Sequence, residues 1–238
     1  MVVTRSHSGT AQAAWPDLQA SITNLRRYPR VEHLPVSQKH AAVLVPLFQD
    51  ADGVVRVILT LRSAKLNTHK GEVCRAGGRA GGKRDPSDGS DEATALREAQ
   101  EELGLDPAQC EVITELPPFL SKHRLSVTPV VAVVPLHHRL QPNADEVEQI
   151  FTMPLHLFLQ DVPSHTYKDV EWESMPYRLH YFQHEAFVVW GLTAAILIQV
   201  AQKALGRAPE FAENIPGGRP NTQLWFNKSK LTFREDTT

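Results

Sequence analysis

The stretch from residue 90 to residue 105, SDEATALREAQEELGL, constrains this chain of 238 residues more than any other. It predicts one short helix. Ser90 suits the N-cap, because its hydroxyl can accept a backbone N–H of the first turn, and Gly104 is a natural stop. Alanine and leucine recur between them at helical spacing, which predicts one buried face.

The same helix carries closely spaced acids. Glu98, Glu101 and Glu102 lie three and four positions apart, so they project from neighbouring positions on one face. Carboxylates this close repel one another unless a cation joins them, and Mg²⁺ binds carboxylate oxygens while keeping waters for a substrate phosphate. The alternative is a solvated charged face with Arg97 as the counter-ion. The helix alone leaves both interpretations open.

The residues before the helix add a second constraint. Gly81 and Gly82 open a loop that leads through Asp88 into the run REAQEELGL at 97–105. This pattern resembles the Nudix box, in which a glycine, a short loop and an acid precede R-E-x-x-E-E-x-G and an apolar residue. Residues 97–105 match it at every fixed position. Asp88 replaces the usual loop glutamate one residue further from the arginine, and this longer loop is typical of the coenzyme A diphosphatase branch of the Nudix hydrolases.

A second motif of that branch lies upstream. It consists of an apolar strand, Thr-x-Arg-Ser, and then Leu-x-x-His-x-Gly-x-Val. The resemblance implies that Arg62, Ser63 and His69 lie on the substrate side, where a guanidinium is a natural partner for phosphate. A loop cation in water is the alternative for Arg62. The chain matches the motif at Thr60, Arg62, Ser63, Leu66, His69, Gly71 and Val73.

The glycine loop departs from the family pattern. After Val73 the branch has Phe-Pro-Gly-Gly, whereas residues 74–82 read CRAGGRAGG, an apparent duplication of R-A-G-G. Glycines let a backbone approach phosphate closely, so the resemblance assigns Gly81 and Gly82 to substrate binding. Arg-Ala in place of Phe-Pro predicts a looser loop. The sequence leaves open whether a protein with this loop retains or loses enzymatic turnover, and whether the duplication is an artefact of the gene model.

The resemblance implies an α/β fold, the Nudix α/β/α sandwich with a mixed β-sheet. We expect an N-terminal extension at 1–36 that is partly helical, a Nudix domain at 37–210 and a flexible tail at 211–238. Pro129 inside a predicted strand indicates an edge or a bulge. The strands are predicted at 41–48, 53–60, 109–116, 127–135, 177–182 and 186–190, and the helices at 17–27, 90–105 and 191–205.

The resemblance also implies the chemistry. Glu98, Glu101 and Glu102 would hold Mg²⁺ or Mn²⁺, which activates water and screens the charge of a diphosphate. Arg97 would orient a box glutamate. Glu146 is a candidate for an additional ligand or base, with a structural hydrogen bond as the alternative. The expected reaction converts coenzyme A or its acyl derivatives to 4′-phosphopantetheine, or its acyl form, and adenosine 3′,5′-bisphosphate.

Two other functions remain open. One is hydrolysis of another nucleoside diphosphate compound, such as ADP-ribose or a dinucleotide. The other is non-catalytic binding of coenzyme A or a nucleotide, because of the altered loop at 75–82. In each case the expected partner is a small molecule, and the chain is expected to be a monomer or a homodimer.

Composition excludes several classes. A net charge of −2 gives no general attraction to nucleic acid. The two cysteines, Cys74 and Cys110, give neither a disulfide framework nor zinc spacing. The apolar run at 186–201 is shorter than the ~18–20 residues of a membrane span. We expect a cytoplasmic or organellar protein: the first 15 residues favour a disordered start over a mitochondrial or plastid transit peptide, and the last residues lack a peroxisomal Ser-Lys-Leu signal.

Overall fold

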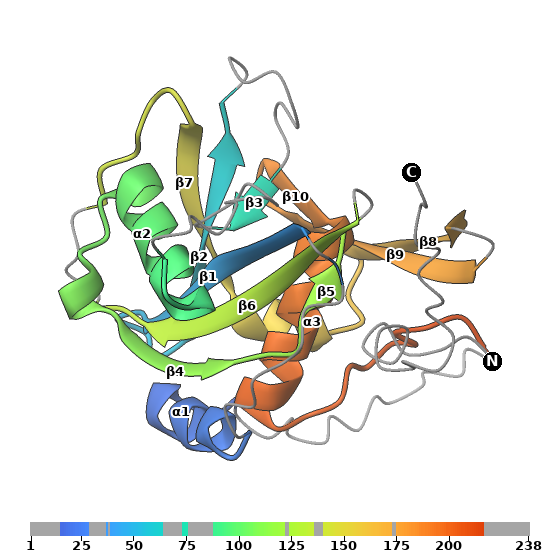
Figure 1. The fold of residues 1–238 in the computed structure, drawn as a ribbon. Helices are drawn as coiled ribbons and strands as arrows, with labels where there is room; N and C mark the ends of the chain where they lie inside the picture. Colours follow the sequence, from blue (N-terminus) through green and yellow to red (C-terminus); the bar gives the residue numbers. More distant parts are fainter. Residues whose placement is uncertain are drawn as a thin grey trace, which may run out of the picture.

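The larger of two sheets is mixed and forms the centre of the molecule (Figure 1). The computed structural model describes residues 15–28, 37, 39–63, 73–75, 88–121, 124–135, 140–172 and 175–216. Within them, β1 pairs in parallel with β6 and antiparallel with β2, and every other pairing in this sheet is antiparallel. Its strands are β1 (Lys39–Gln49), β2 (Val55–Arg62), β3 (Val73–Arg75), β4 (Glu111–Glu115), β5 (Phe119–Leu120), β6 (Leu125–Val133) and β7 (Val147–Pro154).

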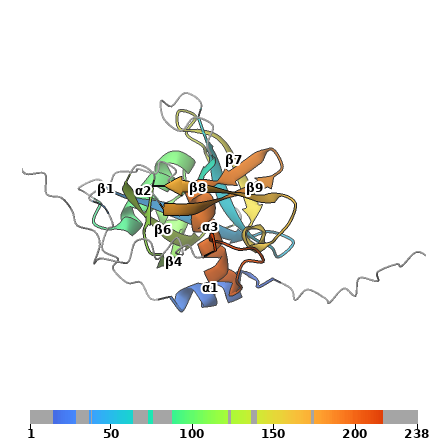
Figure 2. The ribbon, with the colours of Figure 1, turned by 90° about the vertical axis from the view of Figure 1, so that its right-hand side faces the viewer.

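Helices cover both faces of this sheet. Side chains alternate along β1, so Ala42 and Leu44 pack with the buried residues of α2 (Asp91–Leu103), whereas Val43 and Val45 pack in the cluster that contains α3 (Gly191–Leu205). The helix α1 (Leu18–Arg26) lies against α3 in both views (Figures 1 and 2). The predicted α/β/α sandwich with a mixed sheet is therefore confirmed. Short 3₁₀ turns at Pro107–Gln109 (η1) and Leu155–Leu159 (η2) complete the described helical segments.

Pro129 does not mark an edge strand. Its strand β6 lies between β1 and β4, and Pro129 is opposite Val43 of β1. On the other side of β6, pairing passes from β4 at Val130 to β5 at Val127. Pro129 therefore lies at the change of partner, where a missing N–H interrupts no ladder between these strands, and the edge alternative was wrong for that reason. The bulge alternative has a counterpart nearby, because the register of β4 against β6 shifts between Val112 and Thr114.

A smaller antiparallel sheet lies beside α3. The strands predicted at 177–182 and 186–190 are confirmed as β9 (Met175–His184) and β10 (Phe187–Trp190), which form a hairpin, and β8 (His165–Trp172) adds a strand that sequence patterning did not predict. The following segment is bonded to this sheet, because Arg178 donates to the carbonyl of Ala212 (3.1 Å). Ala212 is thus bonded to this sheet, the domain boundary at 210 stays a prediction, and residues 217–238 lie outside the described part of the chain.

A buried histidine pair in this region predicts a pH-dependent stability. The Nε2 atom of His180 faces the carbonyl of Glu213 (2.9 Å) and must donate there, so its Nδ1 accepts from Nε2 of His165 (2.9 Å). Both of these contacts form when the rings are neutral, and the remaining nitrogen of His165, Nδ1, lies 3.8 Å from the carboxylate of Asp161. Burial, with the neighbouring ring, lowers the pKa of His165 to about 4, and burial also lowers the pKa of His180.

Because the unfolded chain binds these protons near pH 6.5 and the folded protein does not, stability is expected to fall as the pH falls from about 6.5 towards 4. Urea unfolding at pH 7.5 and pH 5 measures the loss. Other groups titrate in this range, so the comparison is with His165→Gln, whose amide can replace the donor to His180. An equal pH dependence in the two proteins would contradict the assignment.

Candidate functional site

The acidic helix α2 forms as its sequence predicts. The hydroxyl of Ser90 accepts the backbone N–H of Ala93 (3.1 Å), and two acids occupy the first turn, where the helix dipole favours anions. Gly104 ends the helix with φ +67°, a left-handed conformation that costs glycine little. Ala95, Ala99 and Leu103 are buried against the sheet, so packing fixes the position of the helix that carries the charged side chains.

Gly104→Ala is expected to destabilise the protein by about 1–2 kcal/mol, because a side chain strains the left-handed conformation. The added Cβ would also lie 3.2 Å from the Cβ of Gln141. Gly89→Ala is a matched control, since its Cβ would meet nothing within 4 Å. Thermal unfolding measures both variants, and equal melting temperatures would show that Gly104 is not required at the helix end.

Arg97 joins three carboxylates. Its Nε and Nη2 contact both oxygens of Asp88 (2.9–3.2 Å), its Nη2 lies 3.0 Å from Glu98, and its Nη1 lies 3.0 Å from Glu101. The hydrogen bonds that Arg97 donates to Asp88 are the largest cause that raises the pKa of Arg97 above its ordinary value. The two-pronged contact is thus with Asp88, just before the helix, and the two box glutamates each contact one nitrogen.

Glu102 faces a different guanidinium. Arg62, the last residue of β2, places Nη1 3.8 Å from Oε1 of Glu102, and the two side chains are only 5% and 2% exposed. The adjacent Ser63 is also buried and donates its backbone N–H to the carbonyl of Glu146 (2.9 Å). The structure therefore brings Arg62, Ser63 and the last box glutamate together across forty residues of sequence.

The loop before β7 lies against the C-terminal end of α2. Its Gln141 and Asn143 donate backbone N–H groups to the carbonyls of Leu103 and Glu102, so the loop is fixed to the end of α2. Burial is the largest cause that raises the pKa of Glu98, and the charges of Glu101 and Glu146 add to it against the lowering effect of Arg97. Glu146 therefore lies close enough to act electrostatically on Glu98.

We name these acids the carboxylate cluster; it comprises Asp88, Glu98, Glu101, Glu102 and Glu146. Within it, Asp88, Glu98 and Glu101 contact the guanidinium of Arg97, Glu102 faces that of Arg62, and Glu146 acts on Glu98, so the carboxylates outnumber these guanidiniums. This excess of hard oxygen donors fits a divalent cation such as Mg²⁺ or Mn²⁺. In the part of the chain that the structure describes, no three His, Cys, Asp or Glu side chains form a ready set of ligands. The fit therefore rests on donor chemistry and charge.

The remaining predicted substrate residues are not tested. His69, Gly81 and Gly82 lie outside the described residues, as does most of the glycine loop with its repeated R-A-G-G. The substrate contact predicted for Arg62 and Ser63 also stays a prediction. Two partners were not foreseen from sequence: Asp88 as the main contact of Arg97, and Glu102 as the contact of Arg62. Only the position of Asp88, two residues before the N-cap Ser90, gave a signal.

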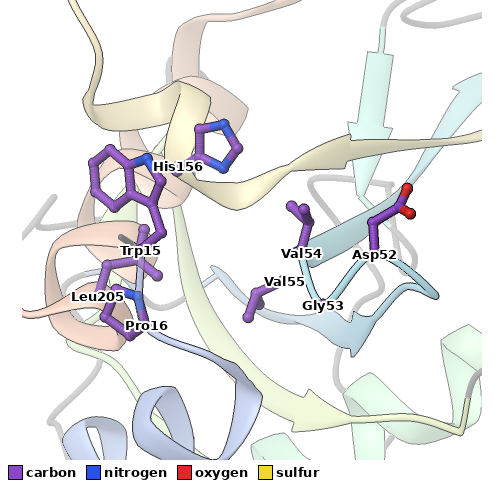
Figure 3. A pocket seen from close by; sticks show the side chains of 8 residues that line it. All are labelled: Trp15, Pro16, Asp52, Gly53, Val54, Val55, His156 and Leu205. Atoms are coloured by element: carbon purple, nitrogen blue, oxygen red, sulfur yellow. The ribbon is translucent and has the colours of Figure 1, made fainter. Parts of the chain in front are cut away.

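A cavity of about 220 Å³ lies elsewhere on the protein (Figure 3). Trp15, Leu205 and His156 lie on one side of it, and Val54 and Val55 on the other, with the ring centroids of Trp15 and His156 5.4 Å apart. The cavity is at the start of β2, whereas the carboxylate cluster is at its end, roughly 23 Å away for eight extended residues. It is therefore separate from the cluster.

The mixed sheet between helices and the acid-rich helix at one end define a Nudix-type domain. A family model described as NUDIX domain matches residues 38–172. Since this match covers more than half of the chain, the protein belongs to the Nudix family.

Curated relatives agree with this membership. The chain is 45% identical over 184 residues to "Nudix hydrolase 15, mitochondrial" of Arabidopsis thaliana, covering 75% of this chain and 63% of the relative. It is 40% identical over 202 residues to "Nudix hydrolase 22, chloroplastic" of the same plant, covering 82% and 65%. It is 39% identical over 189 residues to "Peroxisomal coenzyme A diphosphatase NUDT7" of Mus musculus, covering 76% of each.

The match to the two plant proteins spans slightly less than two thirds of their lengths. The described helices of this chain include none long and apolar enough to cross a membrane.

Proposed function

We propose that this protein is a metal-dependent diphosphatase that cleaves coenzyme A or its acyl derivatives. The observation that carries the proposal is the carboxylate cluster, in which Glu98 and Glu101 contact Arg97, Glu102 lies beside Arg62, and the charge of Glu146 acts on Glu98. Two further facts support it. The upstream sequence at 60–73 resembles the coenzyme A branch, and the mouse relative is named a coenzyme A diphosphatase.

In the proposed mechanism, Glu98, Glu101 and Glu102 would hold Mg²⁺ or Mn²⁺ through their carboxylate oxygens. A cation bound there would supply an activated water and screen the negative charge of the diphosphate. Arg97 keeps Glu98 and Glu101 in place from its anchor on Asp88.

Glu146 is a candidate acceptor for the proton of the attacking water, or an additional ligand, because its charge acts on Glu98. The products are 4′-phosphopantetheine, or its acyl form, and adenosine 3′,5′-bisphosphate. Ser63, His69, Gly81 and Gly82 are proposed to bind the substrate.

The test is product analysis after incubation of the full chain with free coenzyme A and Mg²⁺ or Mn²⁺, with and without EDTA. Phosphopantetheine that forms only with metal supports the proposal. Removal of the metal is expected to abolish product formation, because the carboxylates alone only add negative charge near the diphosphate. Product formation that persists in EDTA would contradict the metal-dependent mechanism.

ADP-ribose and a dinucleotide belong in the same assay. Faster cleavage of either compound than of coenzyme A would identify that compound as the substrate, and the reaction would still be hydrolysis of a diphosphate. Binding of coenzyme A without any cleavage would identify a non-catalytic binding protein. Removal of one R-A-G-G unit then tests whether the enlarged glycine loop is the cause, since restored turnover would implicate it. The relatives named mitochondrial, chloroplastic and peroxisomal support an organellar location as part of this proposal.

A further inference from the structure

Arg62 is directed into the protein by the geometry of its strand. Alternate residues of β2 face the same side, and Ile58 on that side packs in the cluster that contains α2. Arg62 follows in the same alternation. Pairing with β7 shifts between Leu61 and Arg62, where Gln149 is opposite the first and Val147 is opposite the second. Such irregularities re-aim side chains at the end of a ladder.

The guanidinium of Arg62 is almost wholly buried. The Arg62 side chain is 5% exposed, and its Nη1 lies 3.8 Å from a carboxylate that is 2% exposed. A phosphate that approaches from solvent cannot reach a group this covered without a rearrangement, whereas Glu102 is already beside it. A buried carboxylate needs a compensating charge, and arginine supplies a permanent one.

From this geometry we infer that Arg62 is a positioning residue that acts through Glu102 and does not contact the substrate phosphates. It holds the carboxylate of the last box glutamate in place before a cation arrives. This inference rests on the proposed function and deepens it. The 3.8 Å separation is longer than a hydrogen bond, so charge rather than the guanidinium fork carries the interaction. Lysine should therefore largely replace Arg62, which it would not do at a two-pronged phosphate contact.

The experiment is a double-mutant cycle read by Mn²⁺ binding to the substrate-free protein, for example by electron paramagnetic resonance. Arg62→Met is expected to raise the Mn²⁺ dissociation constant by about 10-fold, the lower end of the usual effect when the partner of a ligand is lost. Arg62→Lys should raise it much less. In a Glu102→Gln background, Arg62→Met should add no further change, whereas in a Glu98→Gln background it should keep its full effect.

Steady-state kinetics on coenzyme A add a second readout. Arg62→Met is expected to lower kcat and leave the KM of the substrate unchanged. A higher KM with unchanged Mn²⁺ binding would overturn the inference and return Arg62 to a substrate contact. So would an equal effect of Arg62→Met in the Glu102→Gln background, because Arg62 would then act on something else.

Two measures keep the test decisive. The Arg62→Met/Glu102→Gln protein removes both buried charges, and its melting temperature should lie closer to the wild-type value than that of Arg62→Met, so loss of fold is separated from loss of position. The melting temperatures of the wild type, Arg62→Met, Glu102→Gln and the double variant, measured in EDTA, give the same cycle without metal. Additive effects of the two substitutions on the melting temperature would contradict the coupling of Arg62 to Glu102. If the wild-type protein cleaves no coenzyme A, the proposed function fails, while the Mn²⁺ and melting cycles still decide the role of Arg62.

Discussion

Glu102→Gln is expected to lower kcat/KM on coenzyme A by at least about 100-fold, which corresponds to ~2.7 kcal/mol of barrier. The substitution keeps the shape of the side chain and removes the negative charge that a cation needs. Loss of a residue that only supports a metal ligand already costs up to about 100-fold, so loss of a ligand itself should exceed that. Glu101→Gln, whose side chain is 54% exposed, should show a similar loss with less effect on stability.

The matched control is Glu171→Gln, which alters an exposed glutamate on β8 outside the carboxylate cluster and should keep the wild-type rate. Rates are measured over a range of Mn²⁺ concentrations, so that weaker metal binding is distinguished from slower chemistry. If Glu101→Gln and Glu102→Gln both keep the full metal-dependent rate, the assignment of the site to these glutamates is wrong.

Phe158→Ala is expected to cost about 3–5 kcal/mol of unfolding free energy, because it removes a large aromatic side chain from a close-packed interior. Phe158 is fully buried, and its ring packs edge-on against Phe182 at 4.9 Å between centroids. It thus connects η2 with the smaller sheet. For a chain of this length the loss corresponds to a melting temperature lower by roughly 10 °C.

Val188→Ala serves as the comparison, since Val188 is 37% exposed and its truncation should change the melting temperature little. The carboxylate cluster contains no residue of η2, so the folded fraction of Phe158→Ala should retain its rate at low temperature. A melting temperature close to the wild-type value would show that the space left by the ring is refilled.

Local patterns predicted most of the described elements. The acidic helix could be predicted because Ser90, the spaced alanines and Gly104 act within a few residues of one another. The strand pairs β1–β2 and β9–β10 could be predicted because each consists of two apolar runs separated by a short polar segment. The strand β8 has no such signal, because its sequence HTYKDVEW is largely polar and its pairing with β9 determines its conformation.

The site was predicted in its composition more than in its geometry. The three box glutamates could be named from their spacing together with the box resemblance, since the helix fixes their relative positions. The partner of Glu102 could not, because Arg62 approaches from a strand forty residues away through a shifted register. Position in the chain also gave no sign that Arg62 is buried, so the motif placed it with the substrate. The glycine loop stays a prediction, because residues 76–87 lie outside the described part of the chain.

The bonded segment after α3 has a practical consequence for making shortened forms of this protein. The carbonyls of Ala212 and Glu213 are the acceptors for Arg178 and His180, and the carboxylate of Glu213 accepts from Gln202. A version truncated at 210 would remove all three acceptors and leave buried donors facing an open edge. An expression fragment intended for crystallisation, or a tag joined at this end, should therefore retain the chain at least through Glu213.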